Sequence, residues 1–492
     1  MHLPLQLLNA QGLTLHGLCT VVALLVYILT AHVMRQRRHP AAAIAWVLFI
    51  LLLPYVALPA FLLFGSRKIK RPSTRVRPVP VAPAPGMPWA IDTLVDMGQP
   101  RPAPCPRMTL HADGHQAWQA LLDTIDGATD TLDICTFILA RDTVGQELIK
   151  RLAYKAAQGV RVRLMLDGLG QLMSRPPDLD LLRRAGGHTA LFVPPLRSPL
   201  QGRTNLRNHR KLVVADAGRD SARLWCGGRN LAAEYFEGEP GKTAWRDLSL
   251  DLRGPLVSQA SALFEQDWLF AQGERQPVPT PFPPAAPPSP PDAPLRAAHA
   301  PHPASGSAQG DGEWRHGAQL VASGPDQVDD TIYALLVTAT YRAQRSVCLS
   351  TPYFVPDPAL LMALSLAARR GVQVDLLLPA RSNHRMSDLA RNRALRTLAL
   401  AGGRVWLAPG MLHAKLAVFD EDLAMAGSAN LDSRSLFLNY ELMLAFHDHD
   451  DITRLCDWFE AERAQAASFT PKPPGLVRDV AEGLLLWLAF QL

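Results

Sequence analysis

The sequence predicts an α/β protein with two similar domains in a pseudo-two-fold arrangement, preceded by an N-terminal transmembrane helical hairpin. Three observations lead to this prediction. A motif of the form His-x-Lys-x4-Asp begins at His209 and again at His413. Around each copy, apolar runs typical of strands alternate with amphipathic runs typical of helices, which favours mixed or parallel sheets covered by helices on both faces. Two long segments near the N-terminus contain no Asp, Glu, Lys or Arg.

The two uncharged segments, residues 13–34 and 41–64, are each long enough to cross a hydrocarbon core of about 30 Å as a helix. The loop between them is rich in arginine, so we interpret residues 1–66 as a transmembrane hairpin. A cleaved signal peptide is the alternative for the first segment, but residues 1–12 contain no Lys or Arg. Six Lys and Arg in residues 67–77, against three arginines in the loop, favour a cytoplasmic location for the rest of the chain.

Composition also divides the remainder of the chain. Residues 67–107 are rich in Pro and Arg and are expected to form an extended tether. Residues 276–311 are crowded with Pro, Ala, Ser and Gly and predict a linker between domains at residues 108–275 and 312–470. Residues 471–492 are predicted to form an amphipathic segment, either on the bilayer surface or packed on the second domain.

The predicted elements follow the same order in both domains, which supports two copies of one α/β unit. In the first domain, helices are expected at residues 115–128, 144–158 and 181–184, and strands at 132–139, 160–166, 212–215 and 248–252. In the second, helices are expected at residues 327–345 and 358–370, and strands at 347–353 and 372–378.

Charge indicates the kind of partner, and the cysteines indicate whether a metal site or disulfides are expected. A net charge of +6 and a pI of about 9.1 suit an anionic surface, either a membrane or a nucleic acid, and charge alone does not choose between them. The six cysteines form no C-x-x-C pair and lie near no histidine pair at metal-ligand spacing. We therefore expect neither a zinc site nor a disulfide framework, and no cofactor.

The repeated motif predicts a catalytic pocket. In each copy the residues between Lys and Asp are mainly apolar, as in a buried strand. Side chains at i and i+2 share a face of a strand, so His209 and Lys211 face the same space, as do His413 and Lys415. One copy of so short a motif arises easily by chance, but two copies in equivalent places, each followed by a Gly-containing turn ending in Asn, are strong evidence.

Two histidines and two lysines suit the transfer of a phosphoryl group. One imidazole can attack the phosphorus of a phosphodiester to form a phosphohistidine, while the other protonates the departing oxygen and later deprotonates an acceptor hydroxyl. The two lysines would stabilise the charge on the nonbridging oxygens. Asn230, Asn430 and Ser428 are expected to bind or orient the phosphate, and no metal is required.

Each imidazole also needs a carboxylate to orient it. Asp216 and Asp420 complete the two motifs, but they lie at the far end of the strand from His, so we expect them to brace the turn there. Asp247 and Glu441 each open the next predicted strand and are assigned to the imidazoles.

Three segments resemble the phospholipase D superfamily, and within it the bacterial cardiolipin synthases: Asn205–Leu212, Thr351–Asp357 and Asn430–Glu441. The order of a membrane hairpin and two catalytic halves is also similar, so the resemblance covers nearly the whole chain. It implies a multi-pass protein of the bacterial inner membrane that carries two phospholipase D-like domains. Its expected substrates are phosphatidylglycerol and other anionic phospholipids. Gly228 stands where many members carry Ser, and we expect a small effect, the loss of one hydroxyl donor to phosphate.

The resemblance implies a reaction. A phosphatidyl group would pass from one phosphatidylglycerol to a histidine, glycerol would leave, and the hydroxyl of a second phosphatidylglycerol would accept the group to give cardiolipin. Phosphatidylethanolamine is an alternative acceptor. By analogy with the family, His209 is the nucleophile and His413 the acid and base. The basic residues Arg203, Arg207 and Arg210 either attract anionic headgroups or form ordinary solvated surface.

Other functions fit the sequence less well. A phosphodiesterase that hydrolyses lipids, or nucleic acids, would use the same motifs with water as acceptor. A nuclease should show aromatic residues interleaved with basic ones, a pattern that the sequence does not show. A non-catalytic scaffold would be expected to have lost one motif, and two spanning helices cannot readily form a transporter. The oligomeric state stays open.

Overall fold

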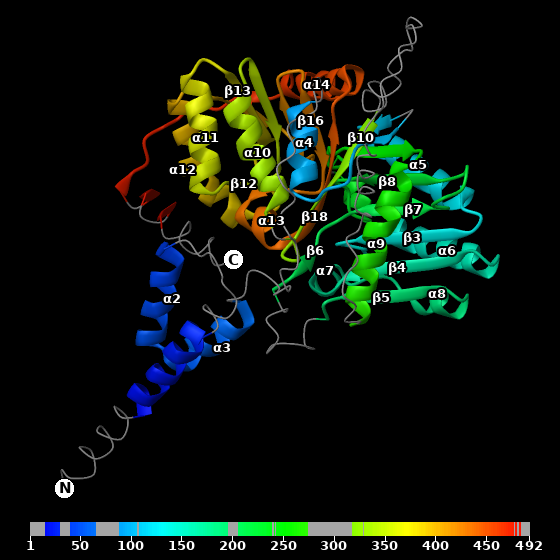
Figure 1. Ribbon diagram of the computed structural model, residues 1–492, viewed down its shortest axis with the longest axis horizontal. Coiled ribbons are helices and arrows are strands. Elements are labelled where there is room, and N and C mark those ends of the chain that lie inside the picture. The colour runs from blue at the N-terminus through cyan, green and yellow to red at the C-terminus, as the bar shows by residue number, and fades with distance from the viewer. Residues whose placement is uncertain are drawn as a thin grey trace, which may run out of the picture.

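The computed structural model shows two α/β domains side by side, with the N-terminal helices outside both (Figure 1). It describes residues 15–29, 40–64, 88–105, 108–194, 205–238, 241, 243–273, 317–327, 329–476, 478–479 and 482–483. The predicted linker at residues 276–311 and Arg203 lie outside this part of the chain.

The first domain contains a seven-stranded mixed sheet. In spatial order its strands are β2 (Met108–His111), β9 (Ser249–Arg253), β8 (Arg223–Gly227), β7 (Leu212–Ala215), β3 (Thr131–Thr136), β4 (Arg161–Asp167) and β5 (His188–Phe192). The pairs β3–β4 and β4–β5 are parallel and the others antiparallel. Helices α5 (Gly114–Gly127), α6 (Thr143–Ala157) and α8 (Asp180–Arg184) cover one face, and α9 (Leu256–Gln272) covers the other.

The second domain repeats this order. Its corresponding strands are β10 (Gly317–Ser323), β18 (Asn439–Phe446), β16 (Leu423–Gly427), β15 (Leu416–Phe419), β11 (Ser346–Ser350), β13 (Gln373–Pro379) and β14 (Arg404–Ala408). Helices α10 (Thr331–Arg342), α11 (Pro358–Arg369) and α12 (Arg385–Leu400) cover one face and α14 (His449–Arg463) the other. The shared order explains the repeated motif, because β7 and β15 are equivalent strands.

Short elements complete the two domains. They are α7 (Gly168–Ser174), the 3₁₀ helix η2 (Ala233–Tyr235), α13 (Ser433–Phe437), the pair β12 (Phe354–Val355) and β17 (Leu431–Asp432), the edge strands β1 (Ala103–Pro104) and β19 (Ala467–Ser468), and β6 (Arg207–Asn208). Strand β6 belongs to the first domain by sequence but pairs in parallel with the start of β18 in the second. The two sheets therefore meet at the first His-x-Lys motif.

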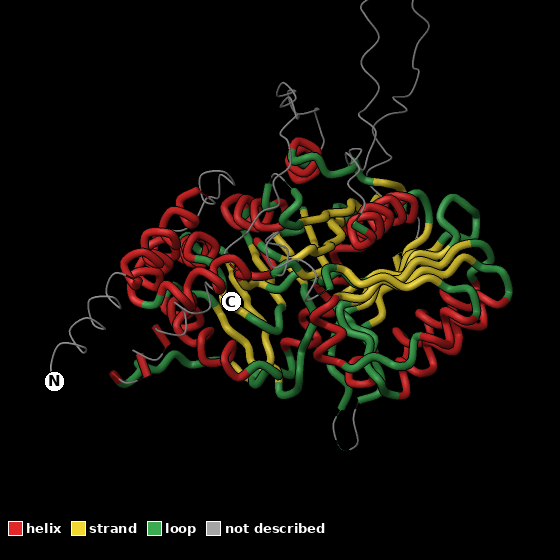
Figure 2. The backbone as a smooth tube through the Cα atoms, turned by 90° about the horizontal axis from the view of Figure 1, so that it is seen from below, coloured by secondary structure: helices red, strands yellow, loops and turns green. Residues whose placement is uncertain are grey.

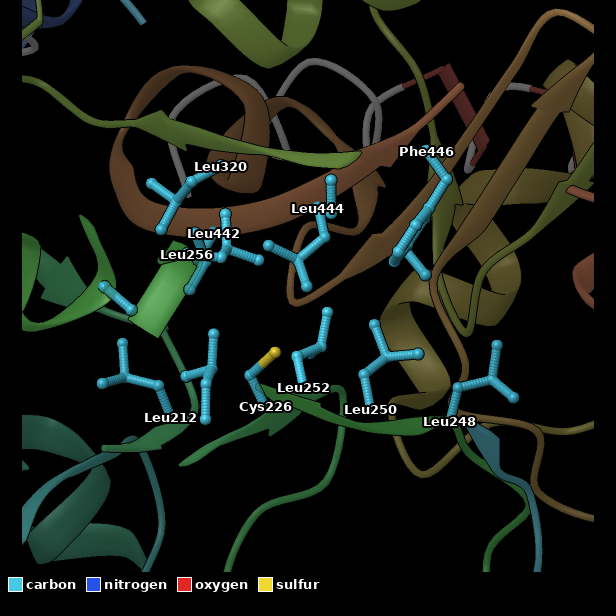
Figure 3. Packing of buried hydrophobic residues seen from close by; sticks show 14 of the residues in the cluster. Leu212, Cys226, Leu248, Leu250, Leu252, Leu256, Leu320, Leu442, Leu444 and Phe446 are labelled. Carbon is cyan, nitrogen blue, oxygen red and sulfur yellow. The ribbon is translucent and has the colours of Figure 1, made fainter. Parts of the chain in front are cut away.

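The inner faces of the two sheets share one apolar core (Figure 3). Leu442, Leu444 and Phe446 of β18 face Leu250 and Leu252 of β9 across the domain boundary, together with Leu320 of β10 (Figure 3). The residues between them on β18, Met443 and Ala445, pack instead beneath α10 on the outer face, as the two-residue period of a strand requires. Figure 2 shows the two sheets in yellow with helices around them. This shared core fixes the position of one domain relative to the other.

Two predicted strands end earlier than expected, and both ends shape the site. The strands expected at residues 132–139 and 347–353 stop at Thr136 and Ser350. In each, a threonine hydroxyl then donates to a carbonyl two residues ahead, Thr136 to Ile138 and Thr351 to Tyr353. The chain turns there towards the domain boundary.

The tether predicted at residues 67–107 is wrong for its second half. Residues 88–105 form α4 (Trp89–Asp96) and β1, and β1 pairs with β10 at the edge of the second sheet. Ala90, Ile91 and Leu94 of α4 are fully buried. Their spacing is that of an amphipathic helix, a signal hidden by the proline-rich sequence before it.

The N-terminal helices differ from the prediction in the second span. A helix covers residues 15–29, and the second predicted span is divided into α2 (Pro40–Leu52) and α3 (Pro54–Phe64). The break precedes Pro54, since the residue before a proline is disfavoured in the helical conformation. The three helices pack together through Ala23, Tyr27, Trp46, Ile50, Ala57 and Phe61. Within the described ranges, none of the helices has both the length and the apolar character needed to cross a membrane.

The C-terminal segment predicted at residues 471–492 lies largely outside the described residues. In its described part, Glu482 is buried and forms ion pairs with Arg396 of α12 and with Arg478. This part of the segment therefore packs on the second domain.

The shared core makes the domain boundary sensitive to truncation. Leu252→Ala should lower the free energy of unfolding by about 2–5 kcal/mol, because it removes a fully buried side chain between two rigid sheets. Leu400→Ala, at a side chain that is 76% exposed, is the matched control and should change it by less than about 0.5 kcal/mol. Denaturant titration of the detergent-solubilised protein measures both, and equal effects would contradict the shared core.

Candidate active site

Each motif histidine takes its backbone hydrogen bond from the opposite domain. The N–H of His209, directly after β6, donates to the carbonyl of Tyr440 on β18 at 2.9 Å. The N–H of His413 donates to the carbonyl of Arg246, just before β9, at 2.7 Å. A parallel bridge between Arg246 and Leu412 repeats the β6–β18 contact. The two histidines therefore occupy equivalent positions at the domain boundary, where Figure 1 shows β6 beside β18.

The predicted orienting carboxylates also come from the opposite domain. Nδ1 of His209 lies 3.0 Å from both carboxylate oxygens of Glu441, and Nδ1 of His413 lies 2.7 Å from Oδ2 of Asp247. Both carboxylates are fully buried. A carboxylate at Nδ1 fixes the imidazole with its proton there, which leaves Nε2 with a lone pair for chemistry.

The two motif lysines lie beside the imidazoles and are buried. Nζ of Lys211 donates to the carbonyl of His209 at 2.7 Å. Nζ of Lys415 donates to the carbonyl of His413 and lies 2.6 Å from its Nδ1 and 3.0 Å from its Nε2. Burial lowers the pKa of Lys211 to about 8 and that of Lys415 to about 7, and the charge of Lys211 contributes to the second shift. The two ammonium groups thus act on one another within one site.

The same electrostatics keep both imidazoles neutral near pH 7. Burial, then Lys415, lowers the pKa of His413 to about 3, and burial also lowers the pKa of His209. Burial alone would raise the pKa of Asp247, but Lys415 and His413 bring it down to about 2. Neutral imidazoles held by charged carboxylates are suited to nucleophilic attack and to accepting a proton.

The motif aspartates brace strand-end turns, as expected, and are remote from the imidazoles in each strand. Both have φ of +50°, in the left-handed region. The carboxylate of Asp216 accepts backbone N–H groups from residues 129–131, and that of Asp420 accepts them from residues 344–346. Although burial opposes it, these donors lower the pKa of Asp216 to about 2. Each aspartate therefore ties its strand to the start of β3 or β11.

The two motif asparagines have different surroundings. Asn230 donates from Nδ2 to the hydroxyl of Tyr235 at 2.7 Å and accepts the N–H of Ile138 at 3.3 Å, so its side chain is engaged within the fold. Asn430 lines a cavity together with His209, and among the described residues nothing lies within hydrogen-bond distance of its Oδ1. The structure thus brings Asn430, rather than Asn230, to the open side of the site.

Ser428 contacts the carboxylate that holds His209 and does not line the cavity. Its hydroxyl donates to Oε2 of Glu441 at 2.5 Å and accepts the N–H of Leu442 at 2.9 Å. In the first domain, a Cβ at the equivalent Gly228 would lie 2.2 Å from Oδ1 of Asp247. The expectation that Gly228 merely lacks a donor to phosphate is therefore wrong, because glycine makes room for the carboxylate of Asp247.

From the sequence, Arg210 is expected either to attract anionic headgroups or to lie on the solvated surface, and both expectations are wrong. It is buried, its Nη1 lies 2.5 Å from both oxygens of Asp267 on α9, and its guanidinium lies over the ring of Tyr440. Asn208 donates to the same carboxylate. The alternation of a strand explains this, since Arg210 must face away from His209.

Aromatic residues that the sequence did not single out surround the imidazoles. The rings of Phe137 and His209 lie 5.1 Å apart, as do those of Tyr235 and His413, and Trp245 lies 5.6 Å from His413. Phe137 directly follows β3 but falls inside the strand predicted at residues 132–139, and its distance from His209 in the sequence does not indicate the contact. Tyr235 and Trp245 reach the second histidine from the first domain, and no local pattern indicates that contact.

A cavity of about 320 Å³ opens at His209 between the domains. It is lined by Phe137, Leu169, Arg207, His209, Tyr353, Val355, Pro356, His384, Met386, Ser387, Ala390, Asn430, Asp432, Ser433, Arg434, Ser435 and Asn439. Its wall combines apolar side chains with two arginines. In the described part of the chain, no group of three or more His, Cys, Asp or Glu side chains could hold a metal ion.

A family model described as "Cardiolipin synthase, PLD-like domain" matches residues 121–268 and 336–463, which include both His-x-Lys motifs. The chain belongs to the cardiolipin synthase family of the phospholipase D superfamily. It is therefore a phosphatidyltransferase. A second model, described as "Phospholipase_D-nuclease N-terminal", matches residues 20–66.

Relatives extend the family match over most of the chain. A cardiolipin synthase A from Pseudomonas aeruginosa is 30% identical over 494 residues, covering 96% of this chain and 93% of the relative. A cardiolipin synthase from Geobacillus thermodenitrificans is 30% identical over 443 residues, covering 86% and 83%. Among solved structures, a phosphatidylserine synthase from Haemophilus influenzae has a TM-score of 0.58 at 12% identity, covering 82% of this chain and 98% of its own. That structural likeness establishes the fold.

Replacing Gly228 with serine, the residue commoner in the superfamily, is expected to reduce activity strongly. Gly228→Ser should lower kcat/KM for phosphatidyl transfer about tenfold or more, because the new side chain would displace the carboxylate that orients His413. Gly127→Ser, at a position where a Cβ would meet nothing within 4 Å, is the control and should retain full activity. Wild-type activity in Gly228→Ser would show that Asp247 does not need this space.

The carboxylate of Asp216 should make the free energy of unfolding depend on pH. Its pKa is about 2 in the folded protein against an ordinary 3.8, so its stabilising contribution is complete above about pH 4 and is lost as the pH falls towards 2. Asp216→Asn keeps the shape and tolerates a positive φ, and it should reduce the slope of stability against pH in this window. Urea midpoints between pH 2 and 7 measure the slope, with the exposed Asp220→Asn as control. An unchanged slope would contradict the assignment.

Proposed function

We propose that this enzyme is a cardiolipin synthase that transfers a phosphatidyl group from one phosphatidylglycerol to another, with release of glycerol, through a phosphohistidine intermediate. The observation that carries the proposal is the reciprocal pairing of His209 with Glu441 and of His413 with Asp247, beside two buried lysines. Two neutral imidazoles oriented at Nδ1 supply the nucleophile and the acid–base group that such a transfer needs.

The family analogy gives His209 as the nucleophile and His413 as the acid and base. The cavity supports this order, because His209 lines it and so faces an entering phosphodiester. The bound phosphodiester anion would raise the pKa of His413, whose Nε2 would then take up a proton. His209 Nε2 would bond to phosphorus as the bond from phosphorus to the glycerol oxygen breaks, and the imidazolium of His413 would give that oxygen its Nε2 proton. In the second step the acceptor hydroxyl gives a proton to His413 while its oxygen displaces the histidine.

The lysines would respond to the substrate. Burial lowers the pKa of both lysines, and the charge of Lys211 lowers that of Lys415 further; a phosphodiester anion between them would raise both again. Binding would therefore favour the ammonium forms, which stabilise the negative charge that develops on the nonbridging oxygens. Asn430 would add a neutral group on the cavity side.

We also propose that the N-terminal helices attach the enzyme to the bacterial inner membrane as a multi-pass hairpin, with cytoplasmic catalytic domains. The helices pack through one face and expose large apolar side chains on the other, among them Leu18 at 63%, Leu29 at 61% and Leu52 at 71%. A contiguous apolar surface of this kind is costly in water and suits lipid. Attachment there would place the cavity near its phospholipid substrates.

The proposal predicts the products and the effect of removing each histidine. Vesicles of phosphatidylglycerol incubated with the purified full-length protein should yield cardiolipin and glycerol, measured by mass spectrometry. His209→Ala and His413→Ala should each lower the rate about 1,000-fold or more, since each imidazole acts in both steps. His188→Ala, at an exposed histidine of β5, should retain activity.

The same experiment separates the alternatives. Phosphatidic acid without cardiolipin would indicate a hydrolase and overturn the proposal. Addition of phosphatidylethanolamine tests the second acceptor. A trapped phosphopeptide should contain His209, and an adduct on His413 alone would reverse the order of the two histidines while leaving the reaction unchanged.

A further inference from the structure

Two arginines from opposite domains line the cavity that contains His209. Arg207 belongs to β6 in the first domain, and Arg434 belongs to α13 in the second. Nη2 of Arg434 donates to the backbone carbonyl of Asn205 at 3.0 Å and to its side-chain oxygen at 3.1 Å, which holds the guanidinium against the segment that carries Arg207. Burial, then the charge of Arg207, lowers the pKa of Arg434 to about 10. The two cations are thus close neighbours in a partly buried site.

Strand alternation places Arg207 on the catalytic face. Arg207, His209 and Lys211 are at i, i+2 and i+4, whereas Asn208 and Arg210 both bond to Asp267 on the other side. Two residues of extended chain span about 7 Å. The Cα atoms of Arg207 and His209 are therefore about that far apart, and both side chains line the cavity.

Two acidic residues lie near the arginines, but their oxygens accept backbone N–H groups. Asp167 accepts from Leu169, Gly170 and Asn208, and Asp432 accepts from Ser435 at the start of α13. Burial raises the pKa of both carboxyl groups to about 6, so both are mostly ionised near pH 7 and partly compensate the arginine charges. The two guanidinium groups are the cationic side chains that an anionic ligand would meet in this cavity.

The arginine pair breaks the pseudo-two-fold symmetry of the active site. When His209 is matched with His413 and Asn230 with Asn430, the position of Arg207 corresponds to Met411 and that of Arg434 corresponds to Glu234. The equivalent place beside His413 thus carries a thioether and a carboxylate. Neither the shared fold nor the shared His-Lys chemistry explains a cation pair on one side, so the pair serves something that the two halves do not share.

The proposed reaction needs a binding site on one side only, because the acceptor lipid carries a second phosphodiester. The reacting phosphorus lies between the histidines, and the acceptor lipid brings a second phosphodiester, one glycerol unit away from the hydroxyl that attacks. A separation of about 7 Å along an extended strand is comparable with that bridge. Guanidinium groups bind phosphate oxygens through paired, charge-assisted hydrogen bonds.

We propose that Arg207 and Arg434 form a subsite for the phosphodiester of the acceptor lipid. The inference rests on the proposed function and deepens it, because the subsite selects a phospholipid hydroxyl over water or free glycerol as the group that displaces the histidine. In that step the phosphorus–nitrogen bond breaks, the bond from the acceptor oxygen to phosphorus forms, and the hydroxyl proton passes to the other histidine. The arginines touch the acceptor and take no part in proton transfer.

The test compares a charged acceptor with a neutral one on the same full-length enzyme. Cardiolipin formation in phosphatidylglycerol vesicles uses the subsite, whereas exchange of labelled glycerol into phosphatidylglycerol does not. Arg207→Gln and Arg434→Gln should each lower the ratio of cardiolipin formation to glycerol exchange about 10- to 100-fold, chiefly through a higher KM for the acceptor. Arg434→Lys should restore part of the ratio, since it returns the charge without the paired geometry.

Arg219→Gln is the matched control. Arg219 is exposed, pairs with Asp130 and lies outside the cavity, so both rates should stay at the wild-type level. Glycerol exchange that persists in the arginine variants also shows that they are folded with an intact His-Lys centre.

Two results would overturn the inference. If cardiolipin formation and glycerol exchange fall in parallel in both variants, or if neither changes, the arginines do not hold the acceptor phosphate while the proposed function stands. If the wild-type enzyme exchanges glycerol but forms no cardiolipin, the proposed function fails and the acceptor subsite fails with it.

Discussion

The exchange of hydrogen bonds between the two domains is the constraint on which this active site depends. Each buried histidine bonds to a backbone carbonyl and a carboxylate of the opposite domain. Tyr440 and Glu441 are the partners of His209, and Arg246 and Asp247 are the partners of His413. The acceptor and the carboxylate are adjacent in sequence in both cases. A small shift between the domains would therefore separate both histidines from their carboxylates at once. The apolar core between β9 and β18 prevents such a shift (Figure 3).

The electrostatics follow from the same exchange. Burying two charged lysines costs free energy, and two buried carboxylates compensate their charge. The imidazoles beside them stay neutral. A protein of this family acts on an anionic phosphodiester, and in our proposal that anion would stabilise the charged forms of the two lysines. The balance needs both domains, because each contributes one histidine, one lysine and one carboxylate.

The duplicated halves differ where their roles differ. Gly228 with Asp247 on one side corresponds to Ser428 with Glu441 on the other, two ways of fitting a carboxylate against an imidazole. Asn230 is bonded within the fold, whereas Asn430 lines the cavity. The residues that keep the fold and the His-Lys centre are repeated, and those around the cavity are not. In our proposal, the asymmetric surroundings rather than the repeated motifs select the acceptor.

The sequence by itself determined the doubled α/β plan and the His and Lys side chains of the candidate site, because strand alternation and the spacing of the motif are local properties. It also indicated that Asp247 and Glu441 orient imidazoles and that the motif aspartates brace turns. Only the tertiary structure decided that each carboxylate serves the histidine of the other domain, that Ser428 orients Glu441, and that Arg207 and Arg434 meet. Ser428, directly after β16, is 13 positions from Glu441 on the neighbouring β18, and the other contacts join residues more than a hundred positions apart. No local pattern of hydrophobicity or charge indicates which distant surfaces will pack together.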